Sequence, residues 1–276
     1  NEQGVTLNVI SGDDPRTVSS IARVVGVPGA DAYVDATTLD TPAKLDAAVD
    51  RYHVFGRVTP QQKRELVQAL KRREHTVAMT GVEQEAQIRL MEKIKNHDGK
   101  NSMLVLRPAD VDETTVCWKL AMENTDTPTG LIFSRQNVNS LPAGTNYAEA
   151  ARGAYIVSDS EGTPDVILVA SGSEVSTLVA GAELLHKDGI KTRIVSVPSE
   201  GLFRSQSKEY QESIIPAGAK VFGLTAGLPV NLEGLVGANG KVWGLDSFGF
   251  SAPYKVLDEK LGFNAENVYN QVKAMF

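Results

Sequence analysis

Short apolar runs alternate with amphipathic segments along the whole chain. The runs have the length of β-strands, and each is followed by a segment in which apolar residues recur every three or four positions, as on one face of a helix. In the first part of the chain, strands are predicted in VTLNVIS (5–11), HVFGRV (53–58) and HTVAMTG (75–81), and helices near 15–27, 42–52 and 60–74. Strands that alternate with helices predict a parallel sheet with helices on both faces.

The helix predicted after the first strand shows this pattern clearly. Pro15 suits its first turn, because proline has no backbone N–H to leave unsatisfied there. Val18, Ile21, Ala22 and Val25 then fall on one side of the helix. We expect this side to face the core.

The alternation continues after the strand that ends at Gly81. A helix is predicted for residues 82–96, and a further helix begins at Asp110, where Glu113 three residues later completes a capping-box pattern. Glu83 and Glu85 are expected to be first-turn acids of the earlier helix, where the helix dipole favours anions. Two further strands are predicted at 102–108 and 128–138.

A second domain is indicated by a break in the pattern. Residues 142–164 are rich in glycine and proline and are predicted to be a connector of mixed loop and short strand. The pattern restarts at residue 165, with strands predicted in DVILVASG, KTRIVSVPS, KVFGLTAG and KVWGLDSFG. We therefore predict an α/β protein in which a composite, doubly wound, Rossmann-like parallel sheet (1–141) precedes a second α/β domain (165–276).

Composition narrows the classes of partner. With 42% hydrophobic residues, 22% charged residues and a net charge of −6, the chain has the composition of a globular protein and no electrostatic reason to bind nucleic acid or anionic membranes. No apolar run approaches the roughly 18 residues of a membrane span, and we expect a cytoplasmic protein. Cys117 is the only cysteine, so no internal disulfide is expected, and its apolar helical context predicts a buried, inert thiol.

Several residues could bind an anion. Ser11, Gly12 and Asp13 form a strand-to-helix turn that could hold a phosphate, although such a turn more often only caps a helix. Lys63 lies one turn inside a helix and could reach a phosphoryl group at the strand ends, although a solvated lysine is the commoner outcome. Arg135 lies at the carboxyl end of an apolar strand and could bind a phosphate with two hydrogen bonds, or form a structural ion pair.

One further turn has the same ambiguity. In SGSE (171–174), Ser173 could contribute to an anion site, but a helix N-cap is the simpler interpretation.

Residues 1–81 resemble the phosphorylation (HAD-like) domain of bacterial P-type cation-transporting ATPases. The resemblance is carried, in family order, by EQGVTLNVISGDDPRTVSSIARVVGV, YHVFGRVTPQQKRELVQAL and HTVAMTG. It implies that Ser11, Gly12 and Asp13 contact a phosphoryl group and that Lys63 neutralises its charge. The family's DKTGT nucleophile motif does not occur here, and MTG continues as VEQEA rather than as the metal-binding DGVND, so neither phosphoryl transfer nor a metal site is expected.

Residues 82–276 resemble the carboxyl-terminal part of bacterial transketolases. VEQEAQIRLMEKI, SMLVLRPAD, ETTVCWKLAMEN, PTGLIFSRQN, DVILVASGSEV, RIVSVPS and GLDSFGFSAP occur in family order. The resemblance assigns residues 82–141 to part of the domain that binds the pyrimidine of thiamine diphosphate, and residues 165–276 to the third domain, which usually contributes to the homodimer. It also implies that Arg135, with Ser134 beside it, binds the phosphate of a sugar substrate.

The two resemblances together predict a chimera joined at Gly81–Val82. The full transketolase family uses thiamine diphosphate and Mg²⁺ to transfer a two-carbon ketol unit between sugar phosphates, but its cofactor-activating glutamate and GPTH segment do not occur here. We therefore expect no catalytic residues, no cofactor on this chain alone and no activity on its own. A phosphate- or nucleotide-binding HAD-like module and a purely structural, engineered chimera that forms a homodimer are the alternatives.

Overall fold

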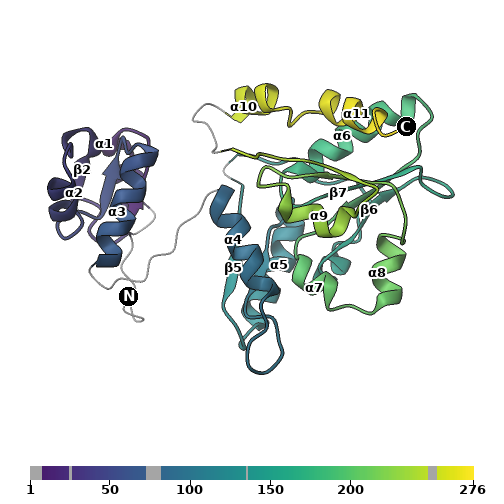
Figure 1. Cartoon of the computed structure of the whole chain (residues 1–276), viewed down its shortest axis with the longest axis horizontal. Coiled ribbons are helices and arrows are strands. Elements are labelled where there is room, and N and C mark those ends of the chain that lie inside the picture. Colours follow the sequence, from purple (N-terminus) through teal and green to yellow (C-terminus); the bar gives the residue numbers. More distant parts are fainter. Residues whose placement is uncertain (1–7, 25–26, 73–81, 135, 248–253) are drawn as a thin grey trace. The chain divides into compact units, whose positions relative to one another are not determined.

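The chain divides into two compact units. In the computed structural model, which describes residues 8–24, 27–72, 82–134, 136–247 and 254–276, the units are Asn1–Met79 and Thr80–Phe276 (Figure 1). The division therefore falls near the predicted seam, and residues 82–141 group with the C-terminal sheet rather than with residues 1–79. The strand predicted at 75–81 lies outside the described residues, so the continuous sheet across 1–141 stays a prediction.

The first unit is a small parallel α/β layer. Its sheet has the order β1-β3-β2, and β3 pairs in parallel with both neighbours. The strands predicted near residues 5–11 and 53–58 are confirmed as β1 and β3, whereas β2 was not predicted from the sequence. The elements are β1 (Val9–Ile10), α1 (Pro15–Val24), β2 (Tyr33–Asp35), the 3₁₀ helix η1 (Ala36–Thr38), α2 (Pro42–Ala48), β3 (Val54–Gly56) and α3 (Pro60–Arg72).

Close packing holds α1 against the central strand. A Cβ placed on Gly56 would lie 2.3 Å from Pro15 Cα, so only glycine permits this approach. Val18 and Ala22 of α1 are buried as predicted, but Ile21 is 60% exposed, so the predicted apolar face was too wide. Val25 lies outside the described residues.

The second unit contains two sheets among its described residues. A five-stranded sheet has the order β10-β9-β7-β8-β6, and β4 and β5 form a parallel pair. The elements are α4 (Val82–Lys93), β4 (Leu104–Leu106), α5 (Val111–Glu123), β5 (Thr129–Leu131), the 3₁₀ helix η2 (Tyr147–Arg152), β6 (Tyr155–Asp159), β7 (Val166–Ala170), α6 (Glu174–Lys187), β8 (Thr192–Ser196), α7 (Glu200–Arg204), α8 (Lys208–Ile214), β9 (Val221–Leu224), α9 (Val230–Val236), β10 (Lys241–Trp243), α10 (Tyr254–Leu261) and α11 (Ala265–Lys273).

Strand β7 lies at the centre of the larger sheet, and every one of its residues is buried. Val166, Leu168 and Ala170 pack with apolar residues of α6 and α11, whereas Ile167 and Val169 pack with those of α7, α8 and α9. Figure 1 shows these two groups of helices on opposite faces of the sheet. The continuous apolar run in the sequence is thus explained by burial on both faces.

The edge strand β6 lies in the segment predicted to be a connector of mixed loop and short strand. It pairs antiparallel with β8 and completes the larger sheet. At the preceding turn Gly153 has φ 90°, and a Cβ there would lie 2.3 Å from the backbone N of Phe203. Gly153 therefore marks a tightly packed corner rather than a flexible linker.

Helix α5 starts as the sequence predicted, with one difference. The side chain of Asp110 accepts a hydrogen bond from the backbone N–H of Glu113 at 2.9 Å, as an N-cap should. The Glu113 carboxylate reaches back one residue further than in a standard capping box, to the N–H of Ala109. Cys117 is fully buried as predicted, and burial, with a smaller contribution from Glu113, raises the pKa of its thiol to about 12.

Candidate functional site

The predicted phosphate-binding turn of the first unit is a compact hydrogen-bonded loop. Ser11 follows β1, and its Oγ donates to the Asp13 carboxylate at 2.9 Å and accepts from the Asp13 N–H at 3.2 Å. Gly12 is exposed and has no positive φ, and a Cβ there would meet only Val58 O at 3.9 Å. The turn therefore joins the side chain of Ser11 to Asp13, and its backbone groups form hydrogen bonds with β3 and with the loop that follows β3.

Lys63 lies near the same edge of the sheet. The chain leaves β3 through residues 57–59, and the Val58 N–H donates to Ser11 O at 2.9 Å, which ties this loop to the turn after β1. Because β1 and β3 are parallel neighbours, both loops leave the sheet at its carboxyl end, where ligands of open α/β sheets bind. The Lys63 side chain is half-buried in the first turn of α3.

Arg57 is a feature of this edge that sequence reasoning missed. Its guanidinium bridges Asp14 at 2.7 Å and Asp35 at 2.9 Å, and its φ of 52° lies in the left-handed region that non-glycine residues rarely adopt. Hydrogen bonds from Thr37, together with Arg57, hold the pKa of Asp35 below its usual value. The only available signal was the Gly56-Arg57 step directly after an apolar strand.

The predicted sugar-phosphate site can be located only in part. Ser134 is half-buried in the loop after β5, and Arg135 lies outside the described residues. The next residue, Gln136, donates from Nε2 to Ser173 Oγ at 3.3 Å, so this loop contacts the SGSE turn. Ser173 is the N-cap residue of α6, as predicted, but its side chain makes no cap hydrogen bond. Its hydroxyl donates instead to Glu174 at 2.9 Å.

A buried cluster of charges fills the carboxyl edges of β4 and β7. Arg107 follows β4, and its guanidinium donates to the carboxylate of Glu174 and to the carbonyl of Ser171, while Glu85 lies 3.6 Å away. Arg89 donates to Glu85 at 3.0 Å and to Ser171 Oγ at 2.8 Å. Each of these side chains is at least nine-tenths buried. The edge at which an open sheet would accept a ligand is therefore occupied by the protein's own ion pairs.

Glu85 makes contacts that its local sequence does not indicate. It was predicted to be a first-turn helix acid, and in the structure it is also buried and paired with two arginines. Burial on its own would raise the pKa of Glu85, but Arg107 and Arg89 more than offset this and lower it. Burial would likewise lower the pKa of Arg107, and the Glu174 and Glu85 carboxylates raise it instead. The side chain of Glu83 is not among those described.

Two further acids are buried where α4 and α5 meet the larger sheet. Glu92 accepts from the Val105 N–H at 3.1 Å and from Ser199 Oγ at 3.0 Å, and burial raises its pKa. Glu113 contacts Ser196 at the end of β8, and burial raises its pKa to about 7. Neither acid forms an ion pair within the described parts of the chain, which distinguishes them from Glu85.

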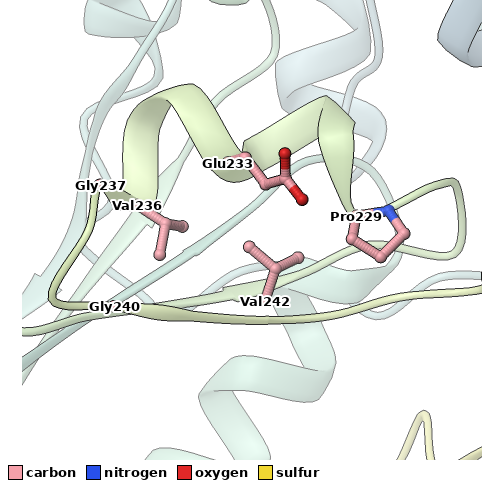
Figure 2. A pocket seen from close by; sticks show the side chains of 6 residues that line it. All are labelled: Pro229, Glu233, Val236, Gly237, Gly240 and Val242. Atoms are coloured by element: carbon pink, nitrogen blue, oxygen red, sulfur yellow. The ribbon is translucent and has the colours of Figure 1, made fainter.

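A shallow pocket lies at the edge of the larger sheet, beside β10. Figure 2 shows the Glu233 side chain above this hollow, with Val236 and Val242 also lining it. Its remaining lining residues are Pro229, Gly237 and Gly240. Because its lining contains a carboxylate and no basic group, the pocket does not suit a phosphate.

The described residues also limit the candidates for metal and membrane binding. Within ranges 8–24, 27–72, 82–134, 136–247 and 254–276, no three His, Cys, Asp or Glu side chains group as metal ligands would. Among the described helices, none combines the length and hydropathy that a bilayer-spanning segment requires.

Fold and topology define the class of the second unit: an α/β domain with one antiparallel edge strand on an otherwise parallel sheet. Residues 153–264 match the transketolase-like TK C-terminal domain. The chain is similar to a transketolase of Staphylococcus aureus (strain MW2), with 44% identity over 177 residues. The match covers about 63% of this chain and 27% of the relative. Transketolase 2 of Vibrio parahaemolyticus serotype O3:K6 is 43% identical over 176 residues, or 63% of this chain and 26% of the relative. The chain thus spans about a quarter of the length of these relatives.

Solved structures agree with this assignment. A transketolase from Leishmania mexicana superposes with a TM-score of 0.63 at 33% identity, over 71% of this chain and 27% of that one. A transketolase from Campylobacter jejuni superposes with a TM-score of 0.59 at 27% identity, and the match covers 84% of this chain and 38% of that one. A split gene transketolase, solved as an inactive beta4 tetramer, superposes with a TM-score of 0.56 over 95% of this chain and 96% of that one. Because the sequence identity is only 16%, this likeness shows the fold alone.

Proposed function

We propose that residues 82–276 act as the carboxyl-terminal part of a cytoplasmic transketolase. In this role the chain contributes to thiamine diphosphate-dependent transfer of a two-carbon ketol unit between sugar phosphates, and it does so together with a polypeptide that carries the cofactor-binding domains. The observation that carries the proposal is the 44% identity over 177 residues, which covers only 27% of the relative. We infer that Arg135, beside Ser134, binds the phosphate of the sugar.

The residues present do not fit thiamine diphosphate by themselves. The buried carboxylates of Glu85 and Glu174 are held by Arg107, so neither is available to a cofactor. Glu92 and Glu113 receive hydrogen bonds from neighbouring serines and backbone amides. We therefore derive no catalytic step through the cofactor, and we expect the 276 residues alone to be inactive.

Ketol-transfer assays test the proposal directly. The chain is assayed with thiamine diphosphate, Mg²⁺ and sugar phosphates, alone and mixed with a purified amino-terminal portion of the Staphylococcus aureus relative. We expect activity only in the mixture. Activity of the chain alone would contradict the proposed inactivity, and an inactive mixture would contradict the proposed partnership.

An arginine pair tests the assignment of the phosphate site. In the active mixture, Arg135→Ala is expected to raise the KM for sugar phosphates at least tenfold, because a bidentate arginine–phosphate contact is lost. Arg152→Ala is the matched control, since Arg152 pairs with Glu149 and stacks over Tyr210 in the same unit. Equal KM values for the two variants would contradict the assignment of Arg135 to the phosphate-binding site.

We also propose that the chain forms a homodimer, as the transketolase resemblance implies. The likeness to transketolases over 63% of the chain supports this proposal. Sedimentation at increasing concentration is expected to show a dimer or a larger assembly. A monomer at all concentrations would contradict this expectation.

A second candidate function is phosphate binding by the first unit. We propose that residues 1–81 derive from a P-type ATPase phosphorylation domain joined to the transketolase part in a chimera, and that Ser11, Gly12, Asp13 and Lys63 bind small phosphorylated ligands. The hydrogen bond between the loops after β1 and β3 supports this, because it joins the two segments at one sheet edge. Inorganic phosphate is expected to raise the unfolding temperature of this unit. Lys63→Ala should abolish the increase, and Lys44→Ala, which removes an exposed lysine paired with Asp40, should not.

A further inference from the structure

Glu113 occupies an unusual position in the second unit. It lies on α5 and is fully buried, and its Oε1 lies 2.7 Å from Ser196 Oγ at the end of β8. Its Oε2 accepts the N–H of Ala109 at 2.5 Å. One carboxyl group thus joins the start of α5 to the central region of the larger sheet.

The groups that face this carboxyl are neutral or acidic. From α5 itself they are the Cys117 thiol and the N-cap Asp110, and from β6 the hydroxyl of Tyr155. Asp110 accepts hydrogen bonds from the Leu141 N–H at 2.9 Å and from the Tyr147 hydroxyl at 2.6 Å, so its own charge is already satisfied. None of the partners of Glu113 in the described part of the chain is a cation.

The hydrogen bonds suit a protonated acid. A hydroxyl such as that of Ser196 can accept a hydrogen bond as well as donate one, so it can receive the proton of a neutral Glu113 while Ala109 donates to the other oxygen. An ionised Glu113 would instead be a buried charge next to Asp110 without a positive partner, which is costly.

We propose that Glu113 is a proton-dependent latch that holds α5 against the larger sheet when it is neutral and weakens that contact when it ionises. The latch lies outside the ligand-binding residues assigned above and does not depend on the proposed transketolase role.

The direction of the pH dependence follows from the pKa values. Burial raises the pKa of Glu113 from 4.5 to about 7, so between these values the folded chain holds a proton that the unfolded chain has lost. The contribution of Glu113 to stability is therefore greatest at low pH and falls as pH rises to about 7. Glu92 contributes to the pH dependence of stability with the same sign, because burial raises its pKa as well. Arg89 lowers the pKa of Glu92 by a smaller amount.

The test compares the wild-type chain with Glu113→Gln. The glutamine amide keeps the hydrogen bonds of the neutral acid, with its oxygen toward Ala109 and its NH₂ toward Ser196 Oγ, and it cannot ionise. Urea unfolding is followed at pH 5.5, 7.0 and 8.5 by the fluorescence of Trp118 and Trp243, the two tryptophans of the chain, both of which lie in the second unit. The ratio of folding equilibrium constants, wild type over variant, is expected to fall by about 30-fold from pH 5.5 to 8.5.

Glu123→Gln is the matched control, because Glu123 lies on the same helix with its side chain 63% exposed. For this variant the ratio is expected to change by no more than about twofold. If the ratio for Glu113→Gln stays constant across the pH range, the proposal is overturned.

An infrared measurement keeps the proposal testable if Glu113→Gln fails to fold. The wild-type chain is expected to show the carbonyl band of a protonated, buried carboxylic acid at pH 5.5, with loss of that band by pH 8.5. Glu92→Gln removes another buried acid whose pKa is raised and leaves the Glu113 band. No such band in either protein at pH 5.5 would overturn the latch.

Discussion

The carboxyl strand ends of the two units carry similar residue types in opposite surroundings. In the first unit, Arg57 bridges Asp14 and Asp35 with its side chain 52% exposed. In the second unit, Arg107 pairs with Glu174 and Glu85, and its side chain is only 9% exposed. Water screens the first set of charges and is excluded from the second. Burial, rather than residue type or topology, thus determines which edge stays open to a ligand and which becomes part of the core.

The largest effect that this comparison predicts is for Arg107→Ala. The substitution leaves the carboxylates of Glu174 and Glu85 buried with one cation fewer, and breaking a buried pair in this way costs about 3–5 kcal/mol of unfolding free energy. Urea unfolding monitored by tryptophan fluorescence measures the loss in the second unit.

Lys100→Ala provides the control, because Lys100 pairs with Asp126 in the same unit and both side chains are more than half exposed. Its loss is expected to cost at most about 1 kcal/mol. Equal losses for Arg107→Ala and Lys100→Ala would show that burial does not separate the two kinds of ion pair.

Two glycines sharpen the comparison within the first unit. Gly56→Ala places a Cβ 2.3 Å from Pro15 Cα, a backbone atom that cannot easily move, so we expect a loss of about 1–3 kcal/mol. Gly12→Ala places a Cβ 3.9 Å from its nearest neighbour, Val58 O, and we expect a change below about 0.5 kcal/mol. Hydrogen exchange of α1 and α3 amides measures both. A large loss for Gly12→Ala would mean that the predicted anion turn has a structural requirement for glycine.

Much of the fold could be predicted because local patterns agree with it. The apolar run in residues 165–172 predicted the central strand β7, and Asp110 predicted the first residue of α5. The transketolase resemblance, carried by ordered motifs, was confirmed for most of the second unit by a match over 153–264. The ATPase resemblance of residues 1–81 and the chimera stay proposals.

The candidate sites were harder to predict because they depend on long-range packing. Glu85 and Arg107 are 22 residues apart in the sequence and meet Glu174 only when β4 and β7 are in place. A helical acid with this local sequence is most often solvated, so nothing local indicated burial. Likewise, the apolar spacing predicted that Ile21 faces the core, but spacing alone could not show that this side chain stays 60% exposed.

The smallest predicted effect concerns Arg57 and separates backbone strain from charge. Arg57→Ala removes two half-exposed ion pairs, worth at most about 1 kcal/mol, and keeps a non-glycine residue at φ 52°. Arg57→Gly removes the same ion pairs but relieves the left-handed conformation, which costs a non-glycine residue about 1 kcal/mol. We therefore expect the glycine variant to be more stable than the alanine variant by about 1 kcal/mol and close to the wild type, as measured by exchange of α1 and β3 amides. If both variants lose the same stability, relief of the left-handed conformation contributes nothing measurable, and the loss at this exposed edge comes from the two ion pairs.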